Sequence, residues 1–355
     1  MRALGMTALA IALFAGWEAR ADEEEPKHRR RPLAAGAAVV PGLVVHGTGH
    51  YVLGETATGH RLLAMEGIGA AGLAGGLAGL AITGASRRFA GAFGLLTIAG
   101  AGLFLVSALT DLYGVLAPEG SRGEPLRTMP YIRTELGLRY VYDPNFEYRS
   151  FLVQGIDYRL RGFKIAPTAW FALNDDNARL MGHVGYRFVG PRPDRRASDG
   201  SYFDIDAGLL HHRYGTERFS MTGGEVMIKG RLDMALLGRT LRGSFTELGG
   251  GFGLQSYRYF EIADEGNTLL LGWFAWGFYI GSGNEVMVYY DHRHDDFAAG
   301  MKLGGLGAVG SGVPGHVGAR GTYFFTDDWG VTADAQIGSA FVGGASLLFR
   351  HGATR

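Results

Sequence analysis

The chain has 355 residues, with 34 basic and 34 acidic side chains, so its formal net charge is zero. This balance gives no general reason to expect binding to nucleic acid or to an acidic partner. The lack of cysteine excludes disulfide bonds, thiolate catalysis and cysteine-ligated metal. A hydrophobic content of 47% and 59 glycines argue against disorder.

The first 21 residues have the pattern of a secretory signal peptide. Arg2 supplies a positive start, residues 8–17 form a short apolar run, and Ala19-Arg20-Ala21 fits a small-x-small cleavage site. Such a run is too short to serve comfortably as an inner-membrane anchor. We therefore expect export of the chain, with the mature protein beginning near Asp22.

Residues 22–33 form a charged segment, acidic at its start and basic afterwards. Pro26 and Pro32 argue against a helix here, because proline has no amide hydrogen to donate and clashes with the preceding turn. We predict a solvated linker.

Residues 34–117 predict a helical hairpin in a bilayer. Leu62–Thr83 and Phe89–Leu116 are apolar, rich in glycine and alanine, and long enough to cross a membrane. Rows of small residues at four-residue spacing would let two helix backbones approach closely. These rows are Gly67, Ala71, Gly75 and Gly79, and beside them Ala70, Ala74 and Ala78.

A glycine- and histidine-rich entry precedes the first apolar stretch. It runs from Pro41-Gly42 through His46-Gly-Thr-Gly-His50-Tyr51 to Gly59-His60. Residues 41–66 resemble the Pro-Gly, Gly-His-Tyr and Gly entry of small bilayer-hairpin domains found in many bacterial membrane proteins. The resemblance implies a topology and no particular chemistry.

His46 and His50 are also candidate metal ligands, because imidazole nitrogen is a common ligand. Nearby residues that would complete such a site are His60, Glu55 and Glu66. The alternative is a structural turn that anchors the entry at the membrane interface. Gly47 and Gly49 favour this alternative, because they weaken the helix that would align the two imidazoles.

After a turn-rich linker, residues 118–129, the period of the sequence changes from helical to two. In residues 132–142 the even positions are mainly apolar or aromatic, whereas the odd positions include two arginines and a glutamate. The same alternation returns up to residue 350, in roughly twelve segments of about ten residues. It resembles bacterial outer-membrane β-barrels. We predict that residues 130–350 form an all-β antiparallel transmembrane barrel of about twelve strands, with ten to fourteen allowed.

A soluble β-sandwich or lipocalin-like barrel would show the same alternation with the apolar face turned inward. Export, the neighbouring apolar hairpin and the regularity of the strands favour the membrane form, in which the charged face lines the lumen. The predicted lumen residues are Arg133, Glu135, Arg139, Asp157, Arg159, Arg179, Asp204, Asp206, Glu225, Arg231, Asp291 and Arg293.

The segment Leu269–Ile280 is apolar on both faces. If the barrel is correct, the second face of this segment should contact something dry, for which the hairpin or a plug is the candidate. Two apolar helices would ordinarily stop in the inner membrane during export, and that membrane is the alternative location. Glycine, alanine and Glu66 weaken insertion, so we expect the outer membrane.

The narrow lumen and its near-equal charges indicate a narrow channel or an envelope scaffold. Salt bridges could fill such a lumen, or the charges could line a path for a small polar solute. Besides a solute, the expected partners are membrane lipid, lipopolysaccharide and, by class, the barrel-assembly machinery.

The alternative function is an outer-membrane lipid-modifying hydrolase that uses a rim site. Its candidate catalytic residues are His292, His294 and Asp295, since imidazole and carboxylate together can perform acid–base catalysis. A rim of paired charges against lipopolysaccharide explains the same residues. No phosphate-binding loop, dinucleotide fingerprint or nucleophile elbow is present, so an enzyme is less favoured and no cofactor is expected.

Overall fold

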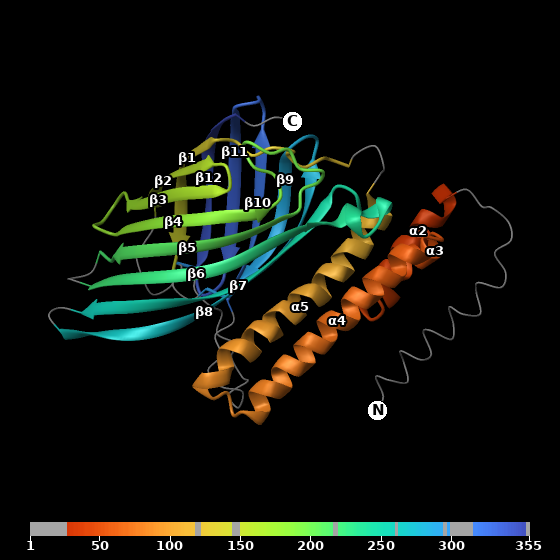
Figure 1. The fold of residues 1–355 in the computed structure, drawn as a ribbon, viewed down its shortest axis with the longest axis horizontal. Helices are drawn as coiled ribbons and strands as arrows, with labels where there is room; N and C mark the ends of the chain where they lie inside the picture. Colours follow the sequence, from red (N-terminus) through yellow and green to blue (C-terminus); the bar gives the residue numbers. More distant parts are fainter. Residues whose placement is uncertain are drawn as a thin grey trace.

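The computed structural model describes residues 27–117, 122–143, 150–215, 219–259, 262–293, 297–298 and 315–352. The predicted signal peptide lies outside these residues, as do His294 and Asp295 of the predicted rim site. Figure 1 shows a helical part lying beside a β-barrel.

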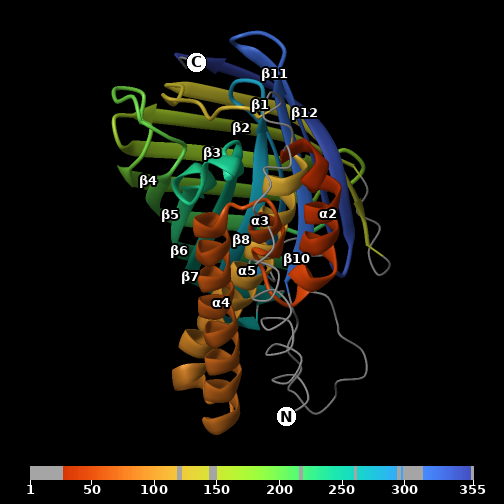
Figure 2. The same cartoon turned by 90° about the vertical axis from the view of Figure 1, so that its right-hand side faces the viewer.

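The predicted helical hairpin is confirmed. Two long helices pack against each other along their length, as Figures 1 and 2 show. Both are long and apolar enough to cross a membrane. The helical elements are α2 (Lys27–Val39), η2 (Pro41–Leu43), α3 (Thr48–Val52), α4 (Thr56–Ile82) and α5 (Arg87–Leu116).

The expectation that residues 22–33 contain no helix is wrong for the part that the structure describes. Helix α2 begins at Lys27 and continues through Pro32. Its later residues are small and apolar, and Ala34 and Ala38 form a buried cluster with Val115 of α5. This tertiary packing outweighs the helix-breaking effect of one proline, which local sequence rules overestimate when the surroundings are unknown.

Small residues do form the contact between α4 and α5, and of the predicted glycines Gly75 and Gly79 meet side chains of α5 whereas Gly67 does not. The contact uses Gly69, Gly72, Gly76 and Gly79, which face α5 near Gly100, Thr97 and Phe93. A row at strict four-residue spacing turns by roughly 40° per step around a helix of 3.6 residues per turn. Gly67 therefore faces open space, and Ala70, Ala71, Ala74 and Ala78 are exposed.

The predicted barrel is confirmed with twelve antiparallel strands. Each strand pairs with the next, and β1 pairs with β12 to close the wall. The strands are β1 (Ile132–Tyr142), β2 (Ser150–Leu160), β3 (Phe163–Ala172), β4 (Ala178–Val189), β5 (Tyr202–Arg213), β6 (Phe219–Asp233), β7 (Ser244–Tyr259), β8 (Ile262–Ile280), β9 (Asn284–Asp291), β10 (His316–Phe324), β11 (Trp329–Ile337) and β12 (Phe341–His351). Because the strand number is even, β1 begins and β12 ends at the same end, which we call the terminal end.

The direction of the side chains separates a membrane barrel from a soluble one. On β1, Leu136 and Leu138 are 52% and 55% exposed on the outside, whereas Arg139 is 8% exposed and points inward. Apolar side chains on the other strands follow the same rule, with Ile156 and Leu209 as examples. An apolar outer wall around a charged interior is the membrane arrangement and the reverse of a soluble barrel.

Helix α5 lies against the outer wall of the barrel over β7 and β8. Glycines on each side receive large side chains from the other: Gly102 faces Phe274, and Gly272 faces Ile98. The inward residues of β8, including Leu271 and Trp273, are buried in the barrel. The expectation that the second face of Leu269–Ile280 contacts the hairpin or a plug is therefore confirmed for the hairpin, which covers the outer face.

Enlarging Gly102 should displace the hairpin from the wall. A Cβ atom at Gly102 would lie 2.6 Å from the Phe274 ring, so Gly102→Leu has no room. Overpacking of this kind costs about 1–3 kcal/mol. The test adds Gly102→Leu to a chain carrying Leu95→Cys and Gly250→Cys, which has no other thiols. The yield of the disulfide between these two cysteines should then fall several-fold.

Gly67→Leu is the matched control, because a Cβ atom at Gly67 meets nothing within 4 Å. It should leave the yield unchanged. Equal yields in the Gly102→Leu and Gly67→Leu backgrounds would contradict the docking of α5 on β7 and β8.

Candidate functional site

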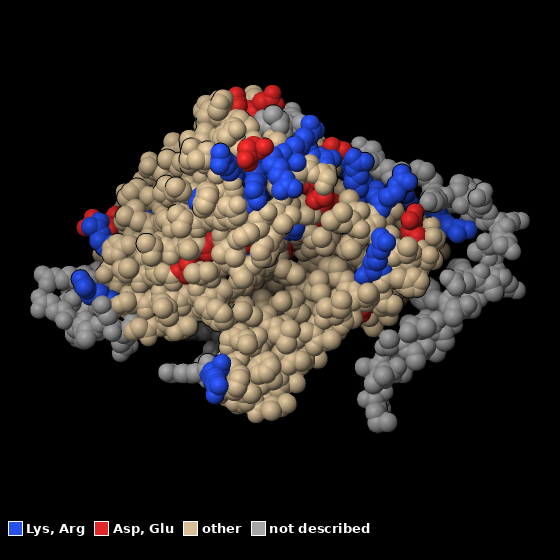
Figure 3. All heavy atoms as spheres, viewed as in Figure 1, with Lys and Arg blue, Asp and Glu red and all other residues tan. Residues whose placement is uncertain are grey.

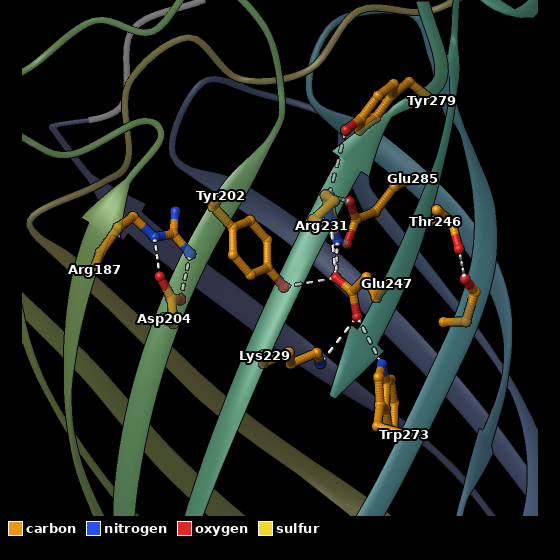
Figure 4. A network of polar contacts seen from close by, with 11 residues as sticks. Arg187, Tyr202, Asp204, Lys229, Arg231, Thr246, Glu247, Trp273, Tyr279 and Glu285 are labelled. Carbon is orange, nitrogen blue, oxygen red and sulfur yellow. Dashed lines mark hydrogen bonds and ion pairs between the residues drawn. The ribbon is translucent and has the colours of Figure 1, made fainter. Parts of the chain in front are cut away.

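Glu247 of β7 is the centre of a buried ionic network in the lumen (Figure 4). Its Oε1 accepts hydrogen bonds from the Tyr202 hydroxyl at 2.7 Å and from Arg231 Nε at 2.9 Å. Its Oε2 accepts one from Trp273 Nε1 at 2.9 Å and lies 2.9 Å from Lys229 Nζ. Only 1% of Glu247 is exposed, so four donors compensate the loss of water around its charge.

The network extends across the lumen from β5 to β9. Arg231 NH1 donates to Glu285 Oε2 of β9 at 2.7 Å, and the Arg231 guanidinium lies over the Phe245 ring at 3.9 Å. The local sequence explains this placement. Lys229 and Arg231 are two residues apart and share the inward face of β6, and Arg231 is the register partner of Glu247.

Further ion pairs line the same interior. Arg187 holds both carboxylate oxygens of Asp204 at 2.7 Å, an arrangement that Figure 4 also shows. Such two-bond pairs fix geometry as well as charge. The other pairs are Arg139–Glu135, Arg159–Asp157, Lys164–Asp206, Arg293–Glu225 and Arg320–Asp334.

The structure thus brings most of the predicted lumen charges together in pairs, and it places the remaining three as follows. Arg133 faces Asp157 in the register of β1 and β2. Arg179 is 2% exposed and lies over the Phe297 ring at 5.7 Å. Asp291 ends β9, opposite Trp273 of β8.

The interior is also occupied near the end opposite the termini. Phe297 and Ala298 belong to the connection between β9 and β10 and are buried against Val141, Phe151 and Val342. The Phe297 ring stacks on Trp170 with centroids 5.6 Å apart. An aromatic cluster therefore occupies part of the interior at this mouth of the barrel.

Of the predicted rim site, the described residues include only His292. Its Nδ1 lies 2.7 Å from the Tyr290 hydroxyl, and its backbone N–H donates to Gly272 of β8 at 2.7 Å. These contacts place His292 beside the strand that α5 covers. The hydrolase hypothesis stays a prediction.

A second buried polar cluster lies at the base of the helical hairpin. The Asp111 carboxylate of α5 accepts hydrogen bonds from the backbone N–H groups of Gly47 at 2.9 Å and Gly49 at 3.2 Å. It also accepts one from His50 Nδ1 at 2.6 Å. His50 Nε2 in turn lies 3.1 Å from the Thr240 hydroxyl of the β6–β7 connection, so the cluster links the hairpin to the barrel.

The glycines of the entry are required by this turn. Gly47 has a φ of +87°, and a Cβ atom there would lie 2.5 Å from the Gly59 carbonyl oxygen. Only glycine adopts this conformation at no steric cost. The His-Gly-Thr-Gly-His sequence therefore forms the turn into α3, where the N–H groups of Gly47 and Gly49 point to one carboxylate.

His46 completes the cluster. Its backbone N–H donates to Glu66 at 2.8 Å, and its Nδ1 lies 2.5 Å from Ser107 Oγ. Among the described residues no group of three or more His, Asp or Glu side chains is arranged to hold a metal ion. The arrangement fits the structural alternative for His46 and His50.

Ser107, Asp111 and Thr240 were not predicted. Ser107 and Asp111 are four residues apart on one face of an apolar helix, and a lone carboxylate in such a helix signals a buried partner. That signal was available in the sequence. Thr240 carried none, because it meets His50 only through the tertiary fold.

Asp111→Asn should destabilise the junction between hairpin and barrel. The change replaces a charged acceptor of three hydrogen bonds, and each such bond contributes about 1.5–3 kcal/mol. We expect a clear fall in the denaturation midpoint, measured by tryptophan fluorescence in detergent. Asp176→Asn, at an exposed position, is the control. Equal midpoints for Asp111→Asn and wild type would contradict the role of Asp111.

The stability of the hairpin base should depend on pH through His46, which lies outside α4 and α5. Burial lowers the pKa of His46 below its ordinary value of 6.5, although Asp111 opposes the shift. The folded state therefore holds the neutral imidazole. The contribution of the neutral His46 imidazole to the stability of the folded state is present above pH 6.5. This contribution is lost as the pH falls through the lower pKa that His46 has in the folded state.

Wild type should lose more thermal stability than His46→Gln when the pH is lowered from about 8 to about 5. Each protein is compared with itself at the two pH values, so any effect of the substitution on thermal stability that does not depend on pH cancels. A wild-type curve parallel to that of His46→Gln would rule out this source of pH dependence.

The closed wall, its apolar outer surface and its charged interior define a transmembrane β-barrel of the bacterial outer-membrane class. Neither a family model nor a curated protein sequence matches the chain. Solved outer-membrane barrels are similar in fold at low sequence identity.

One similar structure is the KdgM porin in complex with disordered oligogalacturonate, with 7% identity and a TM-score of 0.39, covering 61% of this chain and 98% of that one. Another is the outer-membrane protein Omp33 of Acinetobacter baumannii, with 10% identity, a TM-score of 0.33, and coverage of 63% and 99%. The translocator domain of the autotransporter NalP from Neisseria meningitidis has 11% identity, a TM-score of 0.32, and coverage of 62% and 88%.

Proposed function

We propose that this protein is an outer-membrane scaffold, in which a barrel with a filled lumen holds the helical hairpin in the bilayer. The observation that carries the proposal is the burial of charged side chains in the lumen. Glu247, Arg187 and Asp204 are all less than a tenth exposed, although each carries a charge. In a water-filled pore such groups would be hydrated and would have no need of fixed partners.

Two further features support the filled lumen. The Glu247 network crosses from β5 to β9, and the Phe297 cluster occupies the mouth at the other end. The hairpin is the second half of the proposal. Its contacts with the barrel are apolar along α5 and polar at its base, so the barrel holds it at two places.

The scaffold proposal predicts that the wild-type protein conducts little or no ion current in planar bilayers. Lys229→Ala and Arg231→Ala combined with Glu247→Ala and Glu285→Ala remove the crossing network, two positive and two negative charges together, so that no charge of that network is left unpaired. We expect this variant to show measurable current steps that the wild type lacks. The variant must first show the β-sheet circular dichroism of the wild type.

A small polar solute path is the second candidate, and the same recordings decide between the two. Steady wild-type conductance that falls when Arg187 is replaced by alanine would favour a narrow channel and contradict the filled scaffold. Lipopolysaccharide and the barrel-assembly machinery remain expected partners by class.

A further inference from the structure

Arginines from four separate segments gather at the terminal end of the barrel, beside the base of the hairpin. Figure 3 shows a blue patch over this part of the molecule. We call it the basic surface and define it by Arg61, Arg122, Arg127, Arg192, Arg195, Arg196, Arg239 and Arg242. The segments are the start of α4, the stretch that precedes β1, and the β4–β5 and β6–β7 connections.

Specific contacts hold these segments side by side. Arg61 NH1 donates to the Leu237 carbonyl at 2.7 Å, and Arg122 NH1 donates to the Arg239 carbonyl at 3.1 Å. The N–H of Ala197 donates to the Arg127 carbonyl at 2.9 Å. The fold therefore brings these segments together across large distances in the sequence, since Arg61 and Leu237 are 176 positions apart.

Arginines outnumber acidic side chains on this surface. Arg61 and Arg192 bond to backbone carbonyls, which fix a guanidinium without neutralising it. Glu124 pairs with Arg242 and, at 3.9 Å, with Arg127. Among the described residues of these four segments, Asp194 and Asp199 are the other acidic residues, so arginines outnumber carboxylates by eight to three.

The opposite end of the barrel has no such excess. Its described connections and strand ends carry Asp143, Asp175, Asp176 and Asp291 against Arg179, Arg213, Arg258 and Arg293. The excess of arginine is thus a property of one end and does not follow from the overall composition, which is neutral.

The basic surface also borders exposed apolar residues. Leu236, next to the residue that Arg61 contacts, is 56% exposed. Val40, Leu43 and Val44 at the base of the hairpin are also exposed. Arginine beside exposed apolar side chains, at the level where an apolar wall ends, is the combination that binds an anionic lipid surface.

We propose that the basic surface binds the phosphate groups of anionic phospholipids in the membrane leaflet at the terminal end. The planar guanidinium donates two parallel hydrogen bonds to phosphate, whereas the neighbouring apolar residues contact the first carbons of the acyl chains. A soluble acidic partner would match the arginines and leave Leu236 and Val40 without a function. This surface would fix the depth and orientation of the barrel in the bilayer.

The test uses the full chain in neutral detergent micelles, titrated with phosphatidylglycerol or phosphatidylcholine. Bound lipid per protein is measured by mass spectrometry after washing. The wild type should retain phosphatidylglycerol and not phosphatidylcholine. Arg61→Gln combined with Arg239→Gln and Arg242→Gln should weaken retention by roughly 100-fold, from the usual contribution of interfacial arginine to binding anionic lipid.

Arg213→Gln combined with Arg258→Gln is the matched control from the opposite end, and it should bind like the wild type. Equal retention of phosphatidylglycerol by the triple variant and the wild type would overturn the proposal. So would equal retention of the two lipids, or complete displacement of lipid by millimolar inorganic phosphate, which would indicate a small-anion site. The circular dichroism of each variant confirms that the barrel is folded.

Discussion

The need to satisfy every backbone hydrogen bond inside a bilayer governs this structure. A strand edge left open to lipid would cost several kcal/mol for each unpaired group. The chain meets the constraint in two ways. Helices α4 and α5 satisfy their own backbones, and the twelve strands close when β1 pairs with β12. Neither solution leaves an irregular loop against the hydrocarbon in the described wall.

Closure of the barrel determines where the side chains point and which of them need a charged partner. With one face of each strand toward lipid, every second residue points into a narrow lumen, where a charge without a partner is costly. The register then supplies the partners. Arg187 is opposite Asp204, Arg231 opposite Glu247, and Arg320 opposite Asp334, each on adjacent strands. The filled lumen follows from alternation and register together, with long side chains completing the network.

The features that could be read from the sequence are those set by local period. The number of strands and the two long helices follow from hydrophobic periods of two and 3.6 residues in the sequence. The charged residues that face the lumen follow from their odd or even positions within each strand. The errors concern tertiary contacts. Pro32 lies in a helix because Ala34 and Ala38 pack on α5, and the Asp111 cluster depends on residues more than sixty positions apart. The lone carboxylate of Asp111 in an apolar helix indicates a buried partner, but local pattern does not identify that partner.

The contact between the hairpin and the barrel bears on the location of the two apolar helices, which would ordinarily stop in the inner membrane during export. Two apolar helices joined closely to an outer-membrane barrel could not occupy a different membrane, since the linker is short. In the structure Gly102 and Gly272 receive side chains across the boundary between helix and strand, and His50 reaches Thr240. These contacts exist only when the barrel wall is present at the same depth. The hairpin and the barrel wall are therefore one packed unit in this structure, which is the arrangement that a short linker requires.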